Sequence, residues 1–148
     1  MVKKIIFSTG GTGGHIFPAI NLMKHFFDKG YEVMLVTDIR GKNFIKNHPG
    51  FKSYVIEAGT PTNKNFFKKF VSFILIFYSI IKSILILKKE KPDLIFGFGG
   101  YVSFPISFAS KFFGFPLIIY ENNLVLGRAN KYLLNFSKKI FVAKKIVL

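Results

Sequence analysis

The 148 residues are enough for one domain with a substantial core, but they are few for a two-domain enzyme. Lysine and arginine number 22 against 7 acidic residues, and the net charge of +15 should attract polyanions such as nucleic acid, anionic lipid head groups or phosphorylated substrates. Because cysteine is absent, disulfides and thiolate metal sites are excluded, and three scattered histidines argue against a zinc site. The first apolar run breaks at Ser8, too early for the core of a signal peptide, so we expect a protein that is not exported.

Short apolar runs alternate with longer amphipathic stretches along the chain. Strands are predicted over residues 4–8, 32–37, 52–57, 93–98, 116–120 and 139–142. Helices are predicted over residues 17–28, 66–89, 102–113 and 126–136. Continuously apolar strands separated by helices are typical of a parallel sheet covered on both faces. We therefore predict an α/β fold with a doubly wound, Rossmann-like parallel sheet, in which ligands bind at the carboxyl ends of the strands.

The stretch STGGTGGHIFPAI, residues 8–20, joins the first predicted strand to a helix with Pro18 in its first turn. Its four glycines are Gly10, Gly11, Gly13 and Gly14. Without Cβ atoms they can adopt left-handed conformations and present bare N–H groups to a phosphate or a sugar hydroxyl, beside the positive end of the helix. A tight turn made for packing is the alternative. The spacing matches neither the Walker loop nor G-x-G-x-x-G, although Asp38 keeps a dinucleotide enzyme open as a lesser option.

His15 follows these glycines at the start of the predicted helix. An imidazole in this position can accept a proton or a hydrogen bond. A catalytic role and contact with the ligand therefore stand beside the ordinary alternative, a capping or packing residue.

Two further loops have a related pattern. The stretch LIFGFGGYVSFPISFAS, residues 94–110, again runs from a strand through a glycine pair into a helix with Phe-Pro near its start. Because nearby strands place their carboxyl-end loops side by side, two glycine loops suit a ligand with two polar parts; two ordinary turns are the alternative. The stretch YENNLVLGRANKYL, residues 120–133, brings Glu121, Asn122 and Asn123 to another strand end, where they can bind hydroxyls unless Asn123 only caps a helix.

The segments GGTGGHIFPA, GFGGYVSFP and ENN…NKYL, in this order and spacing, resemble the amino-terminal domain of the MurG family. These bacterial N-acetylglucosaminyltransferases convert lipid I to lipid II in peptidoglycan synthesis. The resemblance spans essentially the whole chain, and it implies that residues 1–148 are the amino-terminal, acceptor-side lobe of a GT-B fold of family 28. The donor-binding carboxyl-terminal lobe is absent from this sequence, so we expect a fragment that is inactive alone rather than a natural subunit.

The resemblance also implies roles for residues of the three loops. The sugar of UDP-N-acetylglucosamine would be contacted by Thr12, Gly13, Gly14 and Asn123. The diphosphate of lipid I, the lipid-linked acceptor, would be held around Gly99, Gly100 and Tyr101. The family pattern His-Glu-Gln-Asn reads Tyr-Glu-Asn-Asn over residues 120–123, so the amide at Asn122 is shorter than in the family.

The implied chemistry is an inverting transfer. An acceptor hydroxyl attacks the anomeric carbon while UDP leaves, so a general base must take the hydroxyl proton and donors must stabilise the diphosphate. His15, implied to lie near the reacting centre, and Glu121 are the candidate bases, and His15 is preferred. No Asp-x-Asp cluster is present, and we expect neither a metal ion nor another cofactor in this domain.

One long apolar segment, residues 65–93, raises the question of a membrane. Between residues 70 and 87 only Lys82 is charged, a length that approaches a membrane span. On a helical wheel the lysines and serines of this segment fall opposite a wide apolar face. Lys82 would be costly inside a bilayer, and a crossing would split the sheet between two compartments. A core-facing helix and a helix that also exposes an apolar patch rimmed by lysines are the remaining alternatives. The resemblance to enzymes that act on a lipid-linked substrate favours the second, and it implies peripheral attachment to anionic lipid at the cytoplasmic face of the bacterial inner membrane.

Two other functions fit the same sequence. One is a basic module without catalysis that grips phosphates or nucleic acid, which would bind oligonucleotides with steep salt dependence. The other is a membrane-associated subunit of a two-chain enzyme that makes a different glycolipid. We expect UDP-N-acetylglucosamine and lipid I, and not nucleic acid, to be the ligands.

Overall fold

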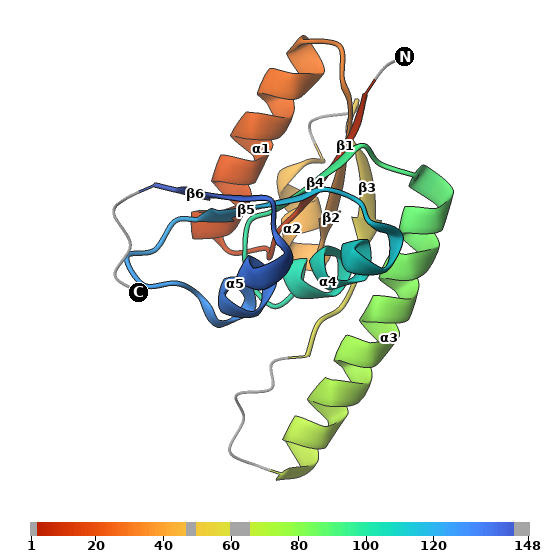
Figure 1. Ribbon diagram of the computed structural model, residues 1–148, viewed down its shortest axis with the longest axis vertical. Helices are drawn as coiled ribbons and strands as arrows, with labels where there is room; N and C mark the ends of the chain where they lie inside the picture. The colour runs from red at the N-terminus through yellow and green to blue at the C-terminus, as the bar shows by residue number, and fades with distance from the viewer. Residues whose placement is uncertain (1–2, 47–49, 60–65, 144–148) are drawn as a thin grey trace.

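The computed structural model describes residues 3–46, 50–59 and 66–143. In chain order its elements are β1 (Lys4–Ser8), α1 (Gly13–Asp28), β2 (Glu32–Thr37), α2 (Ile39–Phe44), β3 (Lys52–Val55), α3 (Phe66–Glu90), β4 (Leu94–Gly97), α4 (Ser103–Phe113), β5 (Leu117–Glu121), α5 (Arg128–Leu133), a 3₁₀ turn (Leu134–Phe136) and β6 (Lys139–Val142) (Figure 1). Six parallel strands form one sheet in the order β3-β2-β1-β4-β5-β6. The predicted α/β fold with a doubly wound parallel sheet is confirmed.

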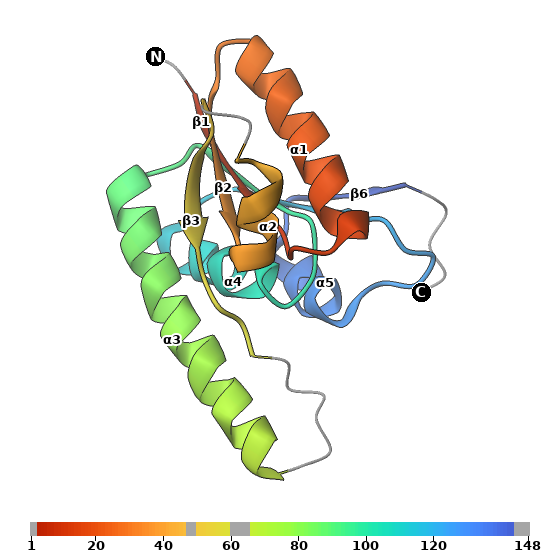
Figure 2. The same cartoon turned by 180° about the vertical axis from the view of Figure 1, so that it is seen from behind.

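Helices cover both faces of the sheet. α1 and α2 lie on one face, and α3, α4 and α5 lie on the other (Figures 1 and 2). Because side chains alternate between the faces of a strand, Phe7 and Leu35 join the core under α1, whereas Ile6 and Met34 join the core under α4. A strand that is buried on both faces needs apolar residues at successive positions, which explains the unbroken apolar runs of the sequence.

The strand order places the important loops. β1 and β4 are neighbours in the sheet although β2 and β3 lie between them in the chain, so the chain winds in opposite directions from this pair. In doubly wound sheets, ligands bind at the carboxyl ends of the strands beside this reversal. The loops that follow β1 and β4 are the two glycine loops of the sequence.

α2 was not predicted. Its six residues are too few to establish a helical period in the sequence, and the helix depends on a capping side chain. The Oδ1 atom of Asp38 accepts the N–H of Gly41 at 2.8 Å, and Asp38 also binds the guanidinium of Arg40, with 2.7 Å between Oδ2 and an Nη atom. Asp38 is therefore occupied within its own turn, which argues against a dinucleotide enzyme in which this carboxylate would bind a ribose.

The carboxyl end of α3 is tied to the sheet by Glu90. This buried carboxylate accepts hydrogen bonds from Lys52 Nζ at 2.7 Å, from the hydroxyl of Tyr54, and from Lys4 Nζ at 3.4 Å. Burial alone would raise the pKa of Glu90, but these donors lower it to about 2. Glu90 is thus a charged anchor between α3, β1 and β3.

The amino-terminal half of α3 extends beyond the edge of the sheet (Figures 1 and 2). The serine side of α3 faces the protein: Ser72, Ser79 and Ser83 are buried, and the Ser79 hydroxyl donates to the carbonyl of Glu57. Its apolar side faces outward, which defines an exposed apolar face of α3. The members of this face are Phe66, Phe67, Phe70, Val71, Phe73, Ile74, Phe77, Tyr78, Ile81 and Leu85.

By length and composition α3 could cross a membrane, with a mean hydropathy of 2.4 and only 17% of its most apolar window buried. However, β3 precedes the helix and β4 follows it, and both strands belong to the same sheet. A crossing would place strands of one sheet on opposite sides of the bilayer. The fold therefore argues against a membrane-spanning α3.

Candidate functional site

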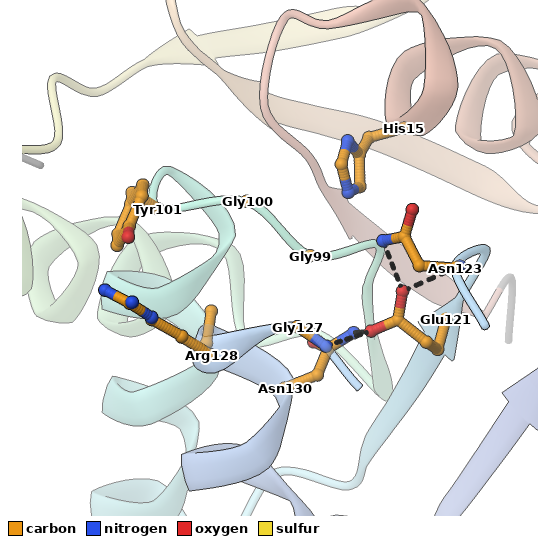
Figure 3. Close-up of a pocket in the computed structure, with 10 residues that line it drawn as sticks. His15, Gly99, Gly100, Tyr101, Glu121, Asn123, Gly127, Arg128 and Asn130 are labelled. Atoms are coloured by element: carbon orange, nitrogen blue, oxygen red, sulfur yellow. Dashed lines mark hydrogen bonds between the residues drawn. The ribbon is translucent and has the colours of Figure 1, made fainter. Parts of the chain in front are cut away.

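A pocket of about 340 Å³ lies at the carboxyl ends of β1, β4 and β5 (Figure 3). It is lined by residues of three segments that are far apart in the sequence: His15 from the start of α1, the loop after β4, and the segment from the end of β5 into α5. The lining residues are His15, Gly99, Gly100, Tyr101, Glu121, Asn123, Gly127, Arg128, Ala129 and Asn130. The three loops singled out in the sequence thus meet at one site.

The two glycine loops touch each other through their backbones. Gly99 and Gly100 have φ angles of +82° and +77°, the left-handed region in which a side chain is strained. A Cβ atom on Gly100 would lie 3.5 Å from Cα of Gly10, and one on Gly99 would lie 3.3 Å from Cδ2 of His15. This loop therefore needs glycine both for its conformation and for its contact with the histidine ring.

The first glycine loop differs from the prediction. Among the described residues, positive φ angles occur at Gly30, Lys91, Gly99, Gly100 and Gly114, and so not at the four glycines of residues 10–14. Gly13 and Gly14 form the first turn of α1, which begins there and not at residue 17. Gly11 is needed for close packing, because a Cβ atom would lie 2.5 Å from the backbone nitrogen of Gly41.

His15 is half-buried, and its ring points from α1 toward Gly99 (Figure 3). Its Nδ1 atom lies 2.8 Å from Oγ1 of Thr12. When Nδ1–H donates to this hydroxyl oxygen, the neutral ring carries its lone pair on Nε2. Thr12 can therefore select the tautomer in which the nitrogen beside Gly99 is able to accept a proton.

Glu121 has both carboxylate oxygens occupied, and it is only 2% exposed. Oε1 accepts from the N–H of Asn123 at 2.9 Å and from its side-chain amide at 2.7 Å. Oε2 accepts from the N–H of Gly127 at 2.8 Å and from Nδ2 of Asn130 at 3.0 Å. Burial raises the pKa of Glu121, but these four donors more than offset it and hold the pKa below its ordinary value. Glu121 is thus an ionised group that folds the loop of residues 122–127 around itself.

Asn122 joins this loop to the first glycine loop. Pro18 lies in the second turn of α1, where its missing N–H leaves the carbonyl of Gly14 without its helical partner. The side-chain amide of Asn122 donates to that carbonyl at 3.2 Å. The amide at Asn122, although shorter than that of the family pattern, therefore bridges two walls of the site.

Four lining residues were not among the predicted site residues: Gly127, Arg128, Ala129 and Asn130. Asn130 is 1% exposed, and its Nδ2 also donates to the carbonyl of Tyr120 at 3.1 Å. Its Oδ1 has no hydrogen-bond partner within the described ranges. The segment GRAN follows the β5 loop in the sequence, but only the turn made around Glu121 brings it back to the pocket.

Only one of the four predicted sugar-contacting residues lines the pocket. Asn123 lines the pocket, whereas Thr12, Gly13 and Gly14 are exposed beside it at the start of α1. Gly99, Gly100 and Tyr101 line it together. In the part of the chain that the structure covers, no three His, Asp or Glu side chains gather in a way that could hold a metal ion.

The sequence profile of the glycosyltransferase family 28 N-terminal domain matches residues 5–142. The chain belongs to this family. A relative in Wolbachia sp. subsp. Brugia malayi is 42% identical over 137 residues, which cover 92% of this chain and 37% of the relative. A second relative, in Rickettsia bellii, is 37% identical over 144 residues, which cover 97% of this chain and 39% of the relative. Both are named UDP-N-acetylglucosamine–N-acetylmuramyl-(pentapeptide) pyrophosphoryl-undecaprenol N-acetylglucosamine transferase.

The crystal structure of Acinetobacter baumannii MurG superposes on this family 28 domain with a TM-score of 0.84 at 26% identity. The superposition covers 99% of this chain and 43% of that enzyme. The resemblance to the MurG family inferred from the three loops is confirmed. The chain spans about two fifths of the length of the curated relatives that it matches.

Proposed function

We propose that this domain is the acceptor-binding half of an N-acetylglucosaminyltransferase that converts lipid I to lipid II in peptidoglycan synthesis. The observation that carries the proposal is a pocket in which the His15 ring faces the left-handed Gly99-Gly100 loop. The names of the relatives supply the donor, UDP-N-acetylglucosamine, and the acceptor, an undecaprenyl pyrophosphate carrying N-acetylmuramyl pentapeptide. Membership of family 28 favours this function over a nucleic-acid-binding module, and nucleic acid is not a proposed partner.

The geometry supports specific roles for the residues of the site. His15 takes the proton of the attacking acceptor hydroxyl through Nε2, and the hydrogen bond from Nδ1–H to Thr12 holds the tautomer that permits it. Backbone N–H groups of the loop 99–101 and the guanidinium of Arg128 bind the acceptor diphosphate. Glu121 keeps Asn123 at the wall of the pocket, where its amide contacts the donor sugar. A carboxyl-terminal lobe binds the uridine diphosphate.

A fusion protein tests this function. The 148 residues are joined to the part of the Wolbachia relative that lies beyond its match, and transfer of radiolabelled N-acetylglucosamine to a lipid I analogue is measured. We expect the fusion to make the disaccharide product, and neither half to make it alone. If the folded fusion makes none while the intact relative does, the proposal is wrong. Product with a different glycolipid acceptor only would favour the two-chain alternative.

We further propose that the domain attaches peripherally to the cytoplasmic face of the inner membrane through the exposed apolar face of α3. Aromatic and aliphatic side chains on this face can enter the boundary between head groups and acyl chains. Five lysines lie at or near the two ends of the helix: Lys68, Lys69, Lys88, Lys89 and Lys91. Their charge, within a total of +15, is attracted to anionic lipid.

Vesicle binding tests this attachment. We expect the chain to bind vesicles that contain phosphatidylglycerol more tightly than vesicles of phosphatidylcholine alone, and to lose this preference in high salt. Ile74→Ser, on α3, should weaken binding about tenfold, because about 1.5 kcal/mol of apolar transfer is lost. The matched control Ile39→Ser removes another exposed isoleucine, 63% exposed against 52% for Ile74, from α2 on the other face of the sheet. Equal binding to both lipids would refute the electrostatic part, and equal loss in both variants would refute the role of α3.

A further inference from the structure

A second cavity of about 380 Å³ adjoins the pocket at its α3 side. The two cavities share Tyr101, Arg128 and Ala129 as a common wall. The other walls of the second cavity are apolar or aromatic, and they come from three helices. They are Phe73 and Ile76 of α3, Phe104 of α4 and Tyr132 of α5, and we call this cavity the α3–α5 groove.

Polarity changes sharply across the shared wall. On the pocket side lie an imidazole, a glycine loop and the amides of Asn123 and Asn130, whereas the groove side offers aromatic rings and one isoleucine. Arg128 stands at the junction, and its side chain extends toward Tyr101 (Figure 3). A guanidinium is a permanent charge that suits a phosphate oxygen. A ligand that fills both cavities therefore has a polar anionic part joined directly to an apolar part.

The groove also leads to the exposed apolar face of α3. Phe73 is a wall of the groove and, at 54% exposure, a member of the exposed apolar face of α3. The groove is thus continuous with the polar pocket at one end and with this apolar face at the other. A chain that runs from a bilayer to the pocket would remain in apolar surroundings until it reaches Arg128.

We propose that the α3–α5 groove binds the isoprene units next to the diphosphate of a polyprenyl diphosphate, with Arg128 on the diphosphate itself. This inference rests on the proposed function, since it assigns a second binding subsite to the same acceptor. In this arrangement the groove draws the first units of the polyprenyl chain out of the lipid, and the head group enters the pocket beside His15. Recognition of the acceptor then includes its lipid and does not depend on the sugar alone.

Soluble ligands test the groove in the absence of a membrane. Binding of geranyl diphosphate and of inorganic pyrophosphate to the 148-residue chain is measured by isothermal titration calorimetry. We expect geranyl diphosphate to bind about tenfold more tightly or better, because its two isoprene units are buried in the groove. Phe73→Ser should remove this advantage and leave pyrophosphate binding unchanged. Arg128→Gln should weaken both ligands about tenfold.

The matched control is Phe77→Ser, one turn further along α3. Phe77 is 66% exposed and does not line the groove, so this variant should bind geranyl diphosphate like the unsubstituted chain. If geranyl diphosphate binds no better than pyrophosphate, or if both phenylalanine variants lose the same affinity, the groove proposal is overturned. The sugar-transfer assay of the fusion decides the proposed function separately, because product can form there whether or not the groove contributes affinity.

Discussion

We expect His15→Ala to slow sugar transfer by the fusion protein about a hundredfold to ten-thousandfold, the usual contribution of a positioned general base. The imidazole is held by Thr12 on one side and faces the Gly99 loop on the other. Both carboxylate oxygens of Glu121, the other candidate base, are occupied by hydrogen bonds, so Glu121 is a poor substitute. The substitution should lower kcat and leave KM unchanged, because the ring accepts the proton in the transition state whereas the loops bind the acceptor. Steady-state rates with saturating acceptor measure this effect.

His25→Ala is the matched control for that variant. His25 lies on the same helix, exposed in its last turn and outside the residues that line the pocket. It should transfer sugar at the rate of the unsubstituted fusion. If the two histidine variants are equally active, or if His15→Ala raises KM without lowering kcat, His15 is not the base.

The second large effect concerns Glu121. We expect Glu121→Gln to lower the free energy of unfolding by about 2–4 kcal/mol. The NH₂ group of the new amide cannot accept a hydrogen bond, so it would face N–H groups that now donate to a carboxylate oxygen. The turn of residues 122–127 should loosen, and ligand binding in the pocket should weaken with it. Urea denaturation of the 148-residue chain at neutral pH measures the loss.

The pH dependence gives this prediction a second readout. The pKa of Glu121 is lower in the folded protein than in the unfolded chain, so its stabilisation is complete above the unfolded-state value and disappears as pH falls through the folded-state value. The parent and Glu121→Gln should therefore differ most at neutral pH and converge in acid. Glu57→Gln, which alters an exposed side chain, should change stability by no more than about 0.5 kcal/mol. A constant difference at every pH would contradict the role of the charge.

Much of the fold was predictable because its signals are local. Unbroken apolar runs indicated strands buried on both faces, and the glycine loops after β1 and β4 indicated the ligand edge of the sheet. The short α2 was missed because Asp38 creates it through capping and not through a repeating apolar pattern. The first helix was predicted to begin at residue 17, but it begins at Gly13. The glycines in its first turn and Pro18 in its second turn do not prevent helix formation there.

The sequence by itself determined the parallel sheet, the three loops that meet at its carboxyl edge, and the presence of His15 and Glu121 among them. These features depend on the spacing of apolar residues and on residue type, which are properties of short segments. The tertiary structure alone decided that Glu121 is enclosed by four donors, that Pro18 frees the Gly14 carbonyl for Asn122, and that Arg128 joins a polar pocket to an apolar groove. It also decided that the serines of α3 face the protein while its phenylalanines face outward. Those outcomes depend on which distant segments the sheet brings together, and no local sequence pattern specifies which segments will meet.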